Sequence, residues 1–333
     1  MNRTELDAFV AHHRLSAEAT RVALELTSAR PSGVELRSFL VKVLQLAGVL
    51  SLAAGLVFFI AANWQAIGVT GRFALIQGVV VASVALALWK PPPHALGRYA
   101  LLMAFIATGA LLALFGQTYQ TGADVYELFL TWALLGVAFV VAGQWSVLSA
   151  AWLIVFNVAL LLFFGGRPEG GWLWAVFFPW RGNESLLLVV PALLNLSLWA
   201  LAEIGRRAQW AACSAHWLAR LALVGAFGFM TWAGIDALAP PSMEGSAGLA
   251  LFVVLVLETG LVIHAMRLRN DVFPLALTAG SLIAIVTYAL GVHSGLDDLG
   301  QALLLALWLT ASSTISGRVL MSLLREWRQE EAA

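Results

Sequence analysis

The chain has 333 residues, of which 61% are hydrophobic and only 11% are charged. A soluble domain carries about twice that charged fraction, so the composition excludes a protein whose whole surface faces water. Basic and acidic residues are equal in number, and the formal net charge of zero argues against a nucleic-acid partner. The single cysteine, Cys213, excludes an internal disulfide and any metal site with several cysteine ligands.

Residues 1–37 are polar and mixed in charge, and they precede the first apolar segment. Thr4 is a typical helix N-cap with an acidic residue three positions later, and Ser16 opens a second stretch with apolar residues at helical spacing. We therefore predict a helical hairpin at residues 1–33, within a soluble or interfacial segment that ends at residue 37. It is not expected to be a signal peptide, because the apolar segment after it is long enough to stay in the bilayer.

Ten apolar segments of membrane-spanning length follow. We predict an all-α integral membrane protein in which a bundle of about ten transmembrane helices occupies residues 38–322 and a cytoplasmic tail occupies residues 323–333. The spans are expected near residues 39–62, 73–89, 99–115, 128–142, 147–164, 186–201, 217–235, 249–266, 273–290 and 302–320.

The basic residues predict the orientation of these spans. If the N-terminus is cytoplasmic, every lysine and arginine falls on the inner side except Arg72, Arg167 and Arg181. Loops then alternate between basic and basic-poor along the whole chain, as the positive-inside rule requires of an even number of spans. We therefore predict that both termini are cytoplasmic.

The densest group of hydrogen-bonding side chains lies at residues 115–127, after the third span and on the predicted outer face. Polar groups at the edge of the hydrocarbon are costly unless they line a cavity or bind something. Several converging polar groups are typical of a ligand site, although isolated interfacial acids are also common. The predicted substrate-binding residues are Gln117, Tyr119, Gln120 and Asp124, together with Asn63 and Trp64, which follow the first span on the same predicted face.

Glu258 lies near the centre of the eighth predicted span, among apolar residues. A carboxylate at this depth is costly when it is charged, so we expect it to be protonated or paired inside the bundle. Two roles remain open, a proton- or cation-coupling site and a neutral side chain that hydrogen-bonds a neighbouring helix, with Gly260 allowing close approach.

Other polar residues within the spans, Asn157 and Asn195 among them, are expected to hold helices together. The six histidines are scattered, and no pair has metal-ligand spacing within a span. The common hydrolase and nucleotide-binding motifs do not occur. We therefore predict no catalytic residue, no metal and no cofactor.

Two motifs carry a resemblance to a known family. They are Ala61-Ala62-Asn63-Trp64 at the end of the first span and Phe115-Gly116-Gln117-Thr118-Tyr119-Gln120-Thr121-Gly122, with Trp132 downstream. Over roughly residues 1–165 the chain resembles a family of bacterial predicted membrane proteins, domain of unknown function number twenty-one fifty-seven. The resemblance implies a multi-pass protein of the bacterial inner membrane and implies no substrate, cofactor or catalytic residue.

Three functions are open on the sequence. A transporter or small-molecule/lipid-binding permease is favoured by the ten spans, by Glu258 and by the polar outer-face residues. The alternative is a structural or regulatory membrane subunit that binds a protein partner through residues 1–33. A membrane-embedded enzyme that uses Asp124, Glu127 or Asp297 as acid–base groups is the weakest, because no nucleophile or metal cluster accompanies them. The expected partners are the lipid bilayer and a small-molecule or lipid ligand.

Overall fold

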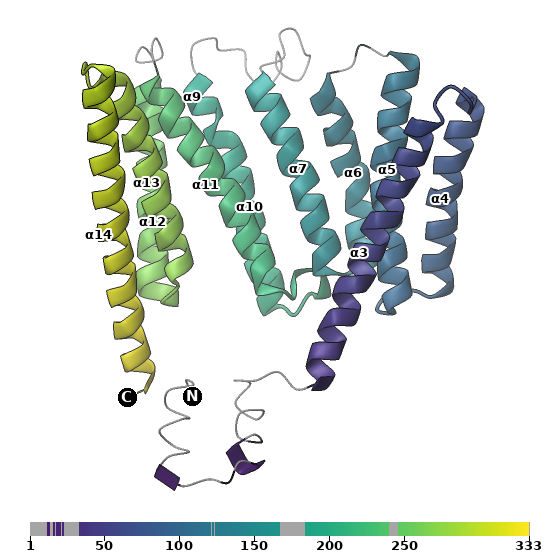
Figure 1. The fold of residues 1–333 in the computed structure, drawn as a ribbon, viewed down its shortest axis with the longest axis horizontal. Coiled ribbons are helices and arrows are strands. Elements are labelled where there is room, and N and C mark those ends of the chain that lie inside the picture. Colours follow the sequence, from purple (N-terminus) through teal and green to yellow (C-terminus); the bar gives the residue numbers. More distant parts are fainter. Residues whose placement is uncertain are drawn as a thin grey trace. The chain divides into compact units, whose positions relative to one another are not determined.

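The computed structural model of the chain describes residues 12–13, 16, 18–20, 22, 33–120, 122, 124–166, 184–239 and 246–332. Within these residues the regular secondary structure is helical, without a strand, which confirms the predicted all-α fold (Figure 1). The hairpin predicted at residues 1–33 lies almost entirely outside them.

Ten helices in the described residues are long and apolar enough to cross a membrane, as predicted. The elements in chain order are α3 (Gly33–Ala62), α4 (Val69–Trp89), α5 (Ala95–Tyr119), α6 (Val125–Gly143), α7 (Ser146–Gly166), α9 (Glu184–Leu187), α10 (Val189–Arg207), η1 (Ala211–Cys213), α11 (His216–Leu238), α12 (Ala247–His264), η2 (Ala265–Arg269), α13 (Val272–His293) and α14 (Asp298–Ala332).

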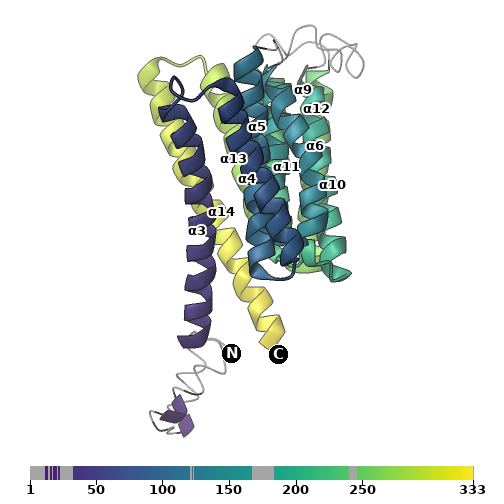
Figure 2. The same ribbon diagram turned by 90° about the vertical axis from the view of Figure 1, so that its right-hand side faces the viewer.

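The helices extend beyond the predicted apolar segments. α14 continues to Ala332, through the predicted tail, and reaches past the ends of α10 and α12 (Figures 1 and 2). Its last turns contain arginine, glutamate and glutamine, which form helices well in water. α3 similarly begins at Gly33, inside the segment predicted to precede the first span. Hydropathy marks the part of a helix that suits the bilayer, whereas backbone hydrogen bonding decides where the helix ends.

The sixth span is interrupted near its start. α9 ends at Leu187 and α10 begins at Val189. Pro191 accounts for the break, because it has no N–H to donate to the carbonyl of Leu187 and its ring would collide with that carbonyl in a continuous helix.

The chain divides into two compact units. The first comprises residues 1–91 and 95–110, and so contains α3, α4 and most of α5. Within it the hydroxyl of Tyr99 donates to the carbonyl of Lys42 over 3.1 Å. The second unit comprises residues 92–94 and 111–333.

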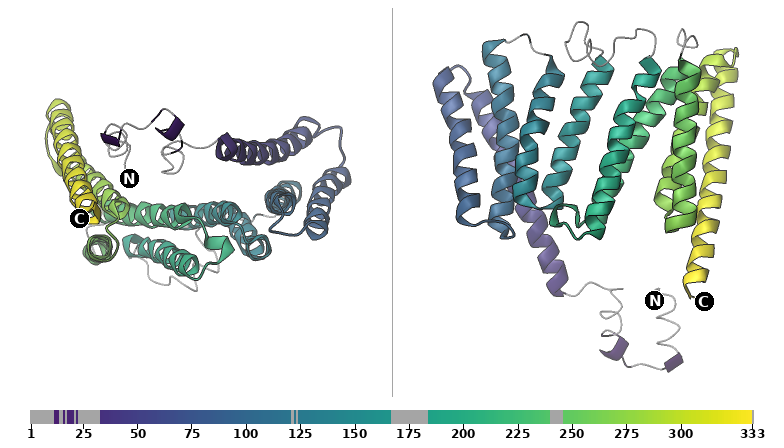
Figure 3. Two further views of the ribbon diagram at one scale, coloured as in Figure 1. Left: turned by 90° about the horizontal axis from the view of Figure 1, so that it is seen from below. Right: turned by 180° about the vertical axis from the view of Figure 1, so that it is seen from behind.

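α11 is the central helix of the second unit, where it contacts α7, α9, α10, α12 and α13. The connections from α10 to α11 and from α12 to α13 lie at one end of these spans, and those from α5 to α6 and from α13 to α14 lie at the other (Figures 1 and 3). Because lipid tails are as apolar as leucine, burial of apolar surface does not drive these helices together, and close packing must do so.

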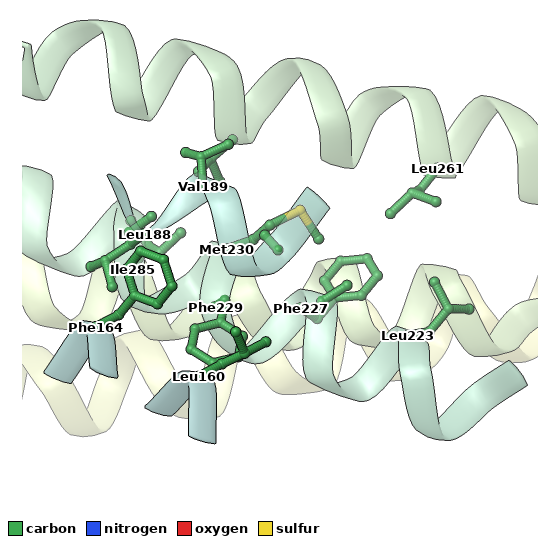
Figure 4. Close-up of a cluster of buried hydrophobic side chains, with 14 residues drawn as sticks. Leu160, Phe164, Leu188, Val189, Leu223, Phe227, Phe229, Met230, Leu261 and Ile285 are labelled. Atoms are coloured by element: carbon green, nitrogen blue, oxygen red, sulfur yellow. The ribbon is translucent and has the colours of Figure 1, made fainter. Parts of the chain in front are cut away.

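Small side chains on α11 allow that packing. Ala226 and Ala233 are fully buried, and a Cβ at Gly234 would lie 2.5 Å from Cδ1 of Ile285 on α13. Larger apolar side chains surround them in one cluster (Figure 4). Its labelled members are Leu160, Phe164, Leu188, Val189, Leu223, Phe227, Phe229, Met230, Leu261 and Ile285.

Asn157 and Asn195 form a reciprocal amide pair between α7 and α10. Asn157 donates to Asn195 Oδ1 over 3.0 Å, and Asn195 donates to Asn157 Oδ1 over 2.8 Å. Each amide also donates to a carbonyl of its own helix, that of Leu153 or Pro191. The predicted helix-joining role of the two asparagines is confirmed.

Gly225 brings α11 against this pair, because a Cβ there would lie 2.5 Å from Asn195 Oδ1 and 2.9 Å from Asn157 Oδ1. Gly225→Ala is therefore expected to lower the free energy of unfolding by about 1–3 kcal/mol, the usual range for overpacking. Gly228→Ala is the matched control, since a Cβ there meets nothing within 4 Å. Thermal unfolding in detergent, followed by tryptophan fluorescence, compares the variants, and equal melting temperatures would contradict this account of Gly225.

Candidate functional site

The predicted polar residues at 115–127 belong to the end of α5 and the start of α6. α5 continues through Gln117 to Tyr119, so these two residues are helical, whereas the sequence analysis placed them after the span. The backbone turns at Gln120 and Gly122, with φ values of 43° and 67°, in the left-handed region. Asp124 then precedes α6, and within the described residues its side chain makes no capping hydrogen bond.

Three of the predicted residues, Gln117, Gln120 and Asp124, line one open groove of about 590 Å³, which we call the polar groove. Glu127 lines it as well. Tyr119 does not, and its ring packs against Phe115, with ring centroids 4.8 Å apart. The full lining is Leu112, Ala113, Phe115, Gly116, Gln117, Gln120, Gly122, Asp124, Val125, Glu127, Leu128 and Thr131.

The polar groove combines two kinds of surface. The amides of Gln117 and Gln120 can both donate and accept hydrogen bonds, and ionised carboxylates at Asp124 and Glu127 only accept them. The remaining lining is largely apolar. This arrangement suits an amphipathic molecule whose polar end carries donors or a positive charge.

Asn63 and Trp64 lie in the first unit, where they take part in the turn from α3 to α4. The Asn63 side chain donates to the carbonyl of Phe59 over 2.8 Å. The guanidinium of Arg72 lies 3.7 Å from the centre of the Trp64 ring and donates to the carbonyls of Trp64 and, over 2.8 Å, Ile67. Sequence reasoning missed Arg72 as the buried partner of Trp64. The available signal was an arginine at the start of a span, eight residues after the tryptophan.

Glu258 is buried inside the second unit, with 2% of its surface exposed. Ser281 of α13 donates to its Oε1 over 2.5 Å, and Thr231 of α11 lies 2.8 Å from the Ser281 oxygen, positioned to donate to it. The other carboxyl oxygen, Oε2, is buried and has no hydrogen-bond partner in the described part of the chain. The carboxyl group therefore joins α12 to α13 directly and reaches α11 through Ser281, and its Oε2 has no partner among the described residues.

The sequence predicts a role for Glu258 but does not identify Ser281 and Thr231 as members of its hydrogen-bond network. A serine or threonine within a span is only a weak indication of a contact between helices, because its hydroxyl usually bonds to a carbonyl of its own helix. Thr231 keeps that option, since its hydroxyl is also 2.7 Å from the carbonyl of Phe227.

A second group of polar residues, unexpected from the sequence, lies at the end of the spans where α12 connects to α13. Arg220 of α11 pairs with Asp271 over 3.3 Å, and Glu203 of α10 pairs with Arg206 over 2.7 Å. The ring of His264 meets that of Trp199 edge-on, with centroids 5.3 Å apart. These side chains surround a small cavity of about 40 Å³, the polar cavity, lined by Trp199, Glu203, His216, Ala219, Arg220, Leu223, His264, Ala265, Asp271 and Pro274.

The polar cavity is not a metal site by its side-chain geometry. Over the described residues, no group of three or more histidine, cysteine, aspartate or glutamate side chains is arranged to hold a metal ion. Each charged residue named above instead has an opposite charge beside it.

The fold and these buried polar contacts define a polytopic α-helical membrane protein. Residues 7–149 match the family model described as predicted membrane protein (DUF2157), and the family resemblance stated from the sequence is confirmed over that range. The match includes the Asn63-Trp64 turn and the polar groove, and it ends before Glu258. Neither the curated proteins nor the solved structures gave a match.

Ser281→Ala removes the hydroxyl that donates to Glu258. Both carboxyl oxygens would then be buried without a partner, so we expect the free energy of unfolding to fall by about 1–3 kcal/mol. Thr259→Ala is the control, because Thr259 is the exposed neighbour of Glu258 and its hydroxyl bonds to the carbonyl of Leu255 in its own helix. Thermal unfolding in detergent reports both changes. A Ser281→Ala variant as stable as Thr259→Ala would show that the contact with Glu258 contributes little.

Cys213 lies in η1, between two spans, and is partly buried. Burial raises the pKa of its thiol above the ordinary value. Because only the thiolate reacts, a raised pKa leaves less of it at neutral pH. We expect iodoacetamide to alkylate Cys213 more slowly in the folded protein than in the denatured chain, with the rate rising at a higher pH than for a free cysteine. Mass spectrometry of the alkylated protein across pH measures this, and equal rates in the two states would contradict it.

Proposed function

We propose that this protein is a proton-coupled permease that moves a small polar or lipid-derived molecule across the membrane. The observation that carries the proposal is Glu258, a buried acid with one carboxyl oxygen bonded by Ser281 and the other without a partner among the described residues. Ionisable residues within a membrane most often mark substrate paths or proton relays.

The physical argument concerns the two protonation states of Glu258. A charged acid at the centre of a membrane helix costs about 2.5–3.5 kcal/mol on insertion scales, so the neutral form is favoured unless a cation or water arrives. When it is neutral, Glu258 has a proton to donate from one carboxyl oxygen. When it is ionised, it can only accept hydrogen bonds, and its bond from Ser281 becomes charge-assisted and stronger. The contacts among α11, α12 and α13 therefore depend on whether the proton is bound.

The polar groove supports the second half of the proposal, a ligand site. Its lining residues surround the connection from α5 to α6, and this connection lies at one end of the second unit (Figure 1). Its amides, carboxylates and apolar walls favour an amphipathic ligand with an amine or several hydroxyl groups. By the positive-inside pattern, this end would face outward from a bacterial inner membrane, with both termini in the cytoplasm.

The test is solid-supported-membrane electrophysiology on proteoliposomes. Pools of amino acids, amines, sugars, nucleosides and lysophospholipids are applied at two pH values, and the transient currents are compared. We expect at least one pool to give a current that depends on the proton gradient in the wild type. Glu258→Gln should abolish the proton dependence, and Thr259→Ala should retain it. No current from any pool, or an unchanged current in Glu258→Gln, would contradict the proposal.

The ligand site has its own test in native mass spectrometry of the protein released from detergent. A molecule bound to the wild type should be lost from the Gln117→Ala/Asp124→Asn double variant, because both side chains line the polar groove. Tyr119→Phe is the control, since Tyr119 lies outside the lining and phenylalanine keeps the ring that packs on Phe115. Equal occupancy in the double variant would remove the polar groove from the proposal.

A further inference from the structure

The three helices that meet at Glu258 also meet at the polar cavity, and they use the same faces for both. Ala265, the first residue of η2 directly after α12, lines the cavity and lies seven positions after Glu258. Residues seven apart in an α-helix share a face and are separated by about 10 Å along the axis. The interface of α12 with its neighbours therefore continues from the carboxyl group to the cavity.

The same relation holds on the other two helices. Pro274 lines the cavity on α13, seven positions before Ser281. Arg220 lines it on α11, eleven positions before Thr231, which is about three turns and again one face. Each helix thus presents one residue of the Glu258 hydrogen-bond network and one residue of the cavity on a common face.

We infer that the polar cavity is the aqueous access site through which protons reach Glu258 between α11, α12 and α13. This inference rests on the proposed function, in that it assumes that Glu258 binds and releases a proton. In this inference the proton comes from the end of the spans that the positive-inside pattern assigns to the cytoplasm.

The cavity itself favours water as its occupant. Nε of Arg220 is buried there without a hydrogen-bond partner among the described residues, so it needs an acceptor. A volume of about 40 Å³ exceeds the space that one water molecule requires. Glu203, His264 and Asp271 offer further polar partners around it. Beside them α12 ends in the π-helical turn η2, a distortion often found at functional sites.

Apolar side chains separate the cavity from Glu258. Leu223, Phe227 and Leu261 are buried members of the apolar cluster, and Leu223 and Leu261 lie at one end of it (Figure 4). Leu261 is on the Glu258 face of α12, between the acid and Ala265. We expect these side chains to move when a proton passes between the cavity and Glu258.

Other titratable groups on the helices around α12 lie elsewhere on the spans. Asp236 accepts from Ser185 over 2.8 Å near the opposite end of α11, and Nε2 of His293 is 3.0 Å from the carbonyl of Leu238 at that same end. Tyr288 lies on α13 beyond Ser281, on the side away from the cavity. The titratable and charged groups on the cavity side are Glu203, His216, Arg220, His264 and Asp271 of the lining. Two further arginines lie near them, Arg206, which pairs with Glu203, and Arg267, which is exposed on η2.

The test uses the fact that the chain has one cysteine. In a Cys213→Ser background, Ala265→Cys places a thiol at the base of the cavity, and Val256→Cys places a control thiol on the exposed face of α12. Silver ion, which reacts with thiols and is small enough for a cavity of about 40 Å³, is added in chloride-free buffer from one side of proteoliposomes. We expect Ala265→Cys to react from the side that carries the α12–α13 connection, and Val256→Cys to react only with a membrane-permeant reagent.

Protonation of Glu258 is followed by its reaction with dicyclohexylcarbodiimide, which modifies protonated carboxyl groups in membranes. Mass spectrometry measures the rate of this labelling. A pH change on the cavity side should change the labelling rate, and prior modification of Ala265→Cys should slow that response by at least about tenfold. Modification of Val256→Cys should leave it unchanged. Leu223→Cys provides the same block from α11 if Ala265→Cys lowers thermal stability.

The outcomes separate this inference from the proposed function. The access site would be overturned if the labelling rate changed only with pH on the opposite side. It would also be overturned if modification of either cavity thiol left the pH response unchanged. Both outcomes would leave Glu258 as a coupling residue. A labelling rate that did not change with pH on either side would overturn both the access site and the proposed coupling role of Glu258. Labelling that follows pH on the cavity side and is blocked at Ala265 or Leu223 supports the inference.

Discussion

The need to satisfy polar groups inside hydrocarbon governs the rest of this structure. Water is absent there, so a buried amide, hydroxyl or carboxyl must find its partner within the protein. The Asn157–Asn195 pair meets this requirement fully, since each amide bonds both to the other and to its own helix. Glu258 meets it only in part, because Ser281 bonds one oxygen and the other is buried without a partner in the described residues. That difference sets Glu258 apart from the asparagine pair and is the basis of the proposed coupling role.

Close packing makes such contacts attainable. α11 contacts α7, α9, α10, α12 and α13, and its small residues let the neighbouring backbones approach. The absence of a Cβ at Gly225 leaves room for the asparagine pair, and the absence of one at Gly234 leaves room for Ile285. The same closeness brings Thr231 within reach of Ser281, and through it the Glu258 network extends over three spans.

Within the second unit, polar side chains gather at both ends of the spans. The polar groove is lined by residues around the α5–α6 connection and the polar cavity by residues around the α12–α13 connection. These two connections lie at opposite ends of the spans (Figures 1 and 3). Glu258 lies between these two levels, along α12. In the proposed permease, the buried acid would lie between a ligand site and a site of proton access.

The sequence by itself determined the all-α class and the ten spans. It also located the polar residues of the groove, because Gln117, Gln120 and Asp124 are near neighbours in the chain. These are local properties, since transfer free energy depends on the composition of each segment. The tertiary structure decided which distant polar residues meet, such as Ser281 with Glu258 and Asn157 with Asn195, and it removed Tyr119 from the groove lining. It also brought the ends of four spans together around the polar cavity. The physical reason is that the rotation and tilt of each helix are set by packing against its neighbours, which hydropathy along one segment does not contain.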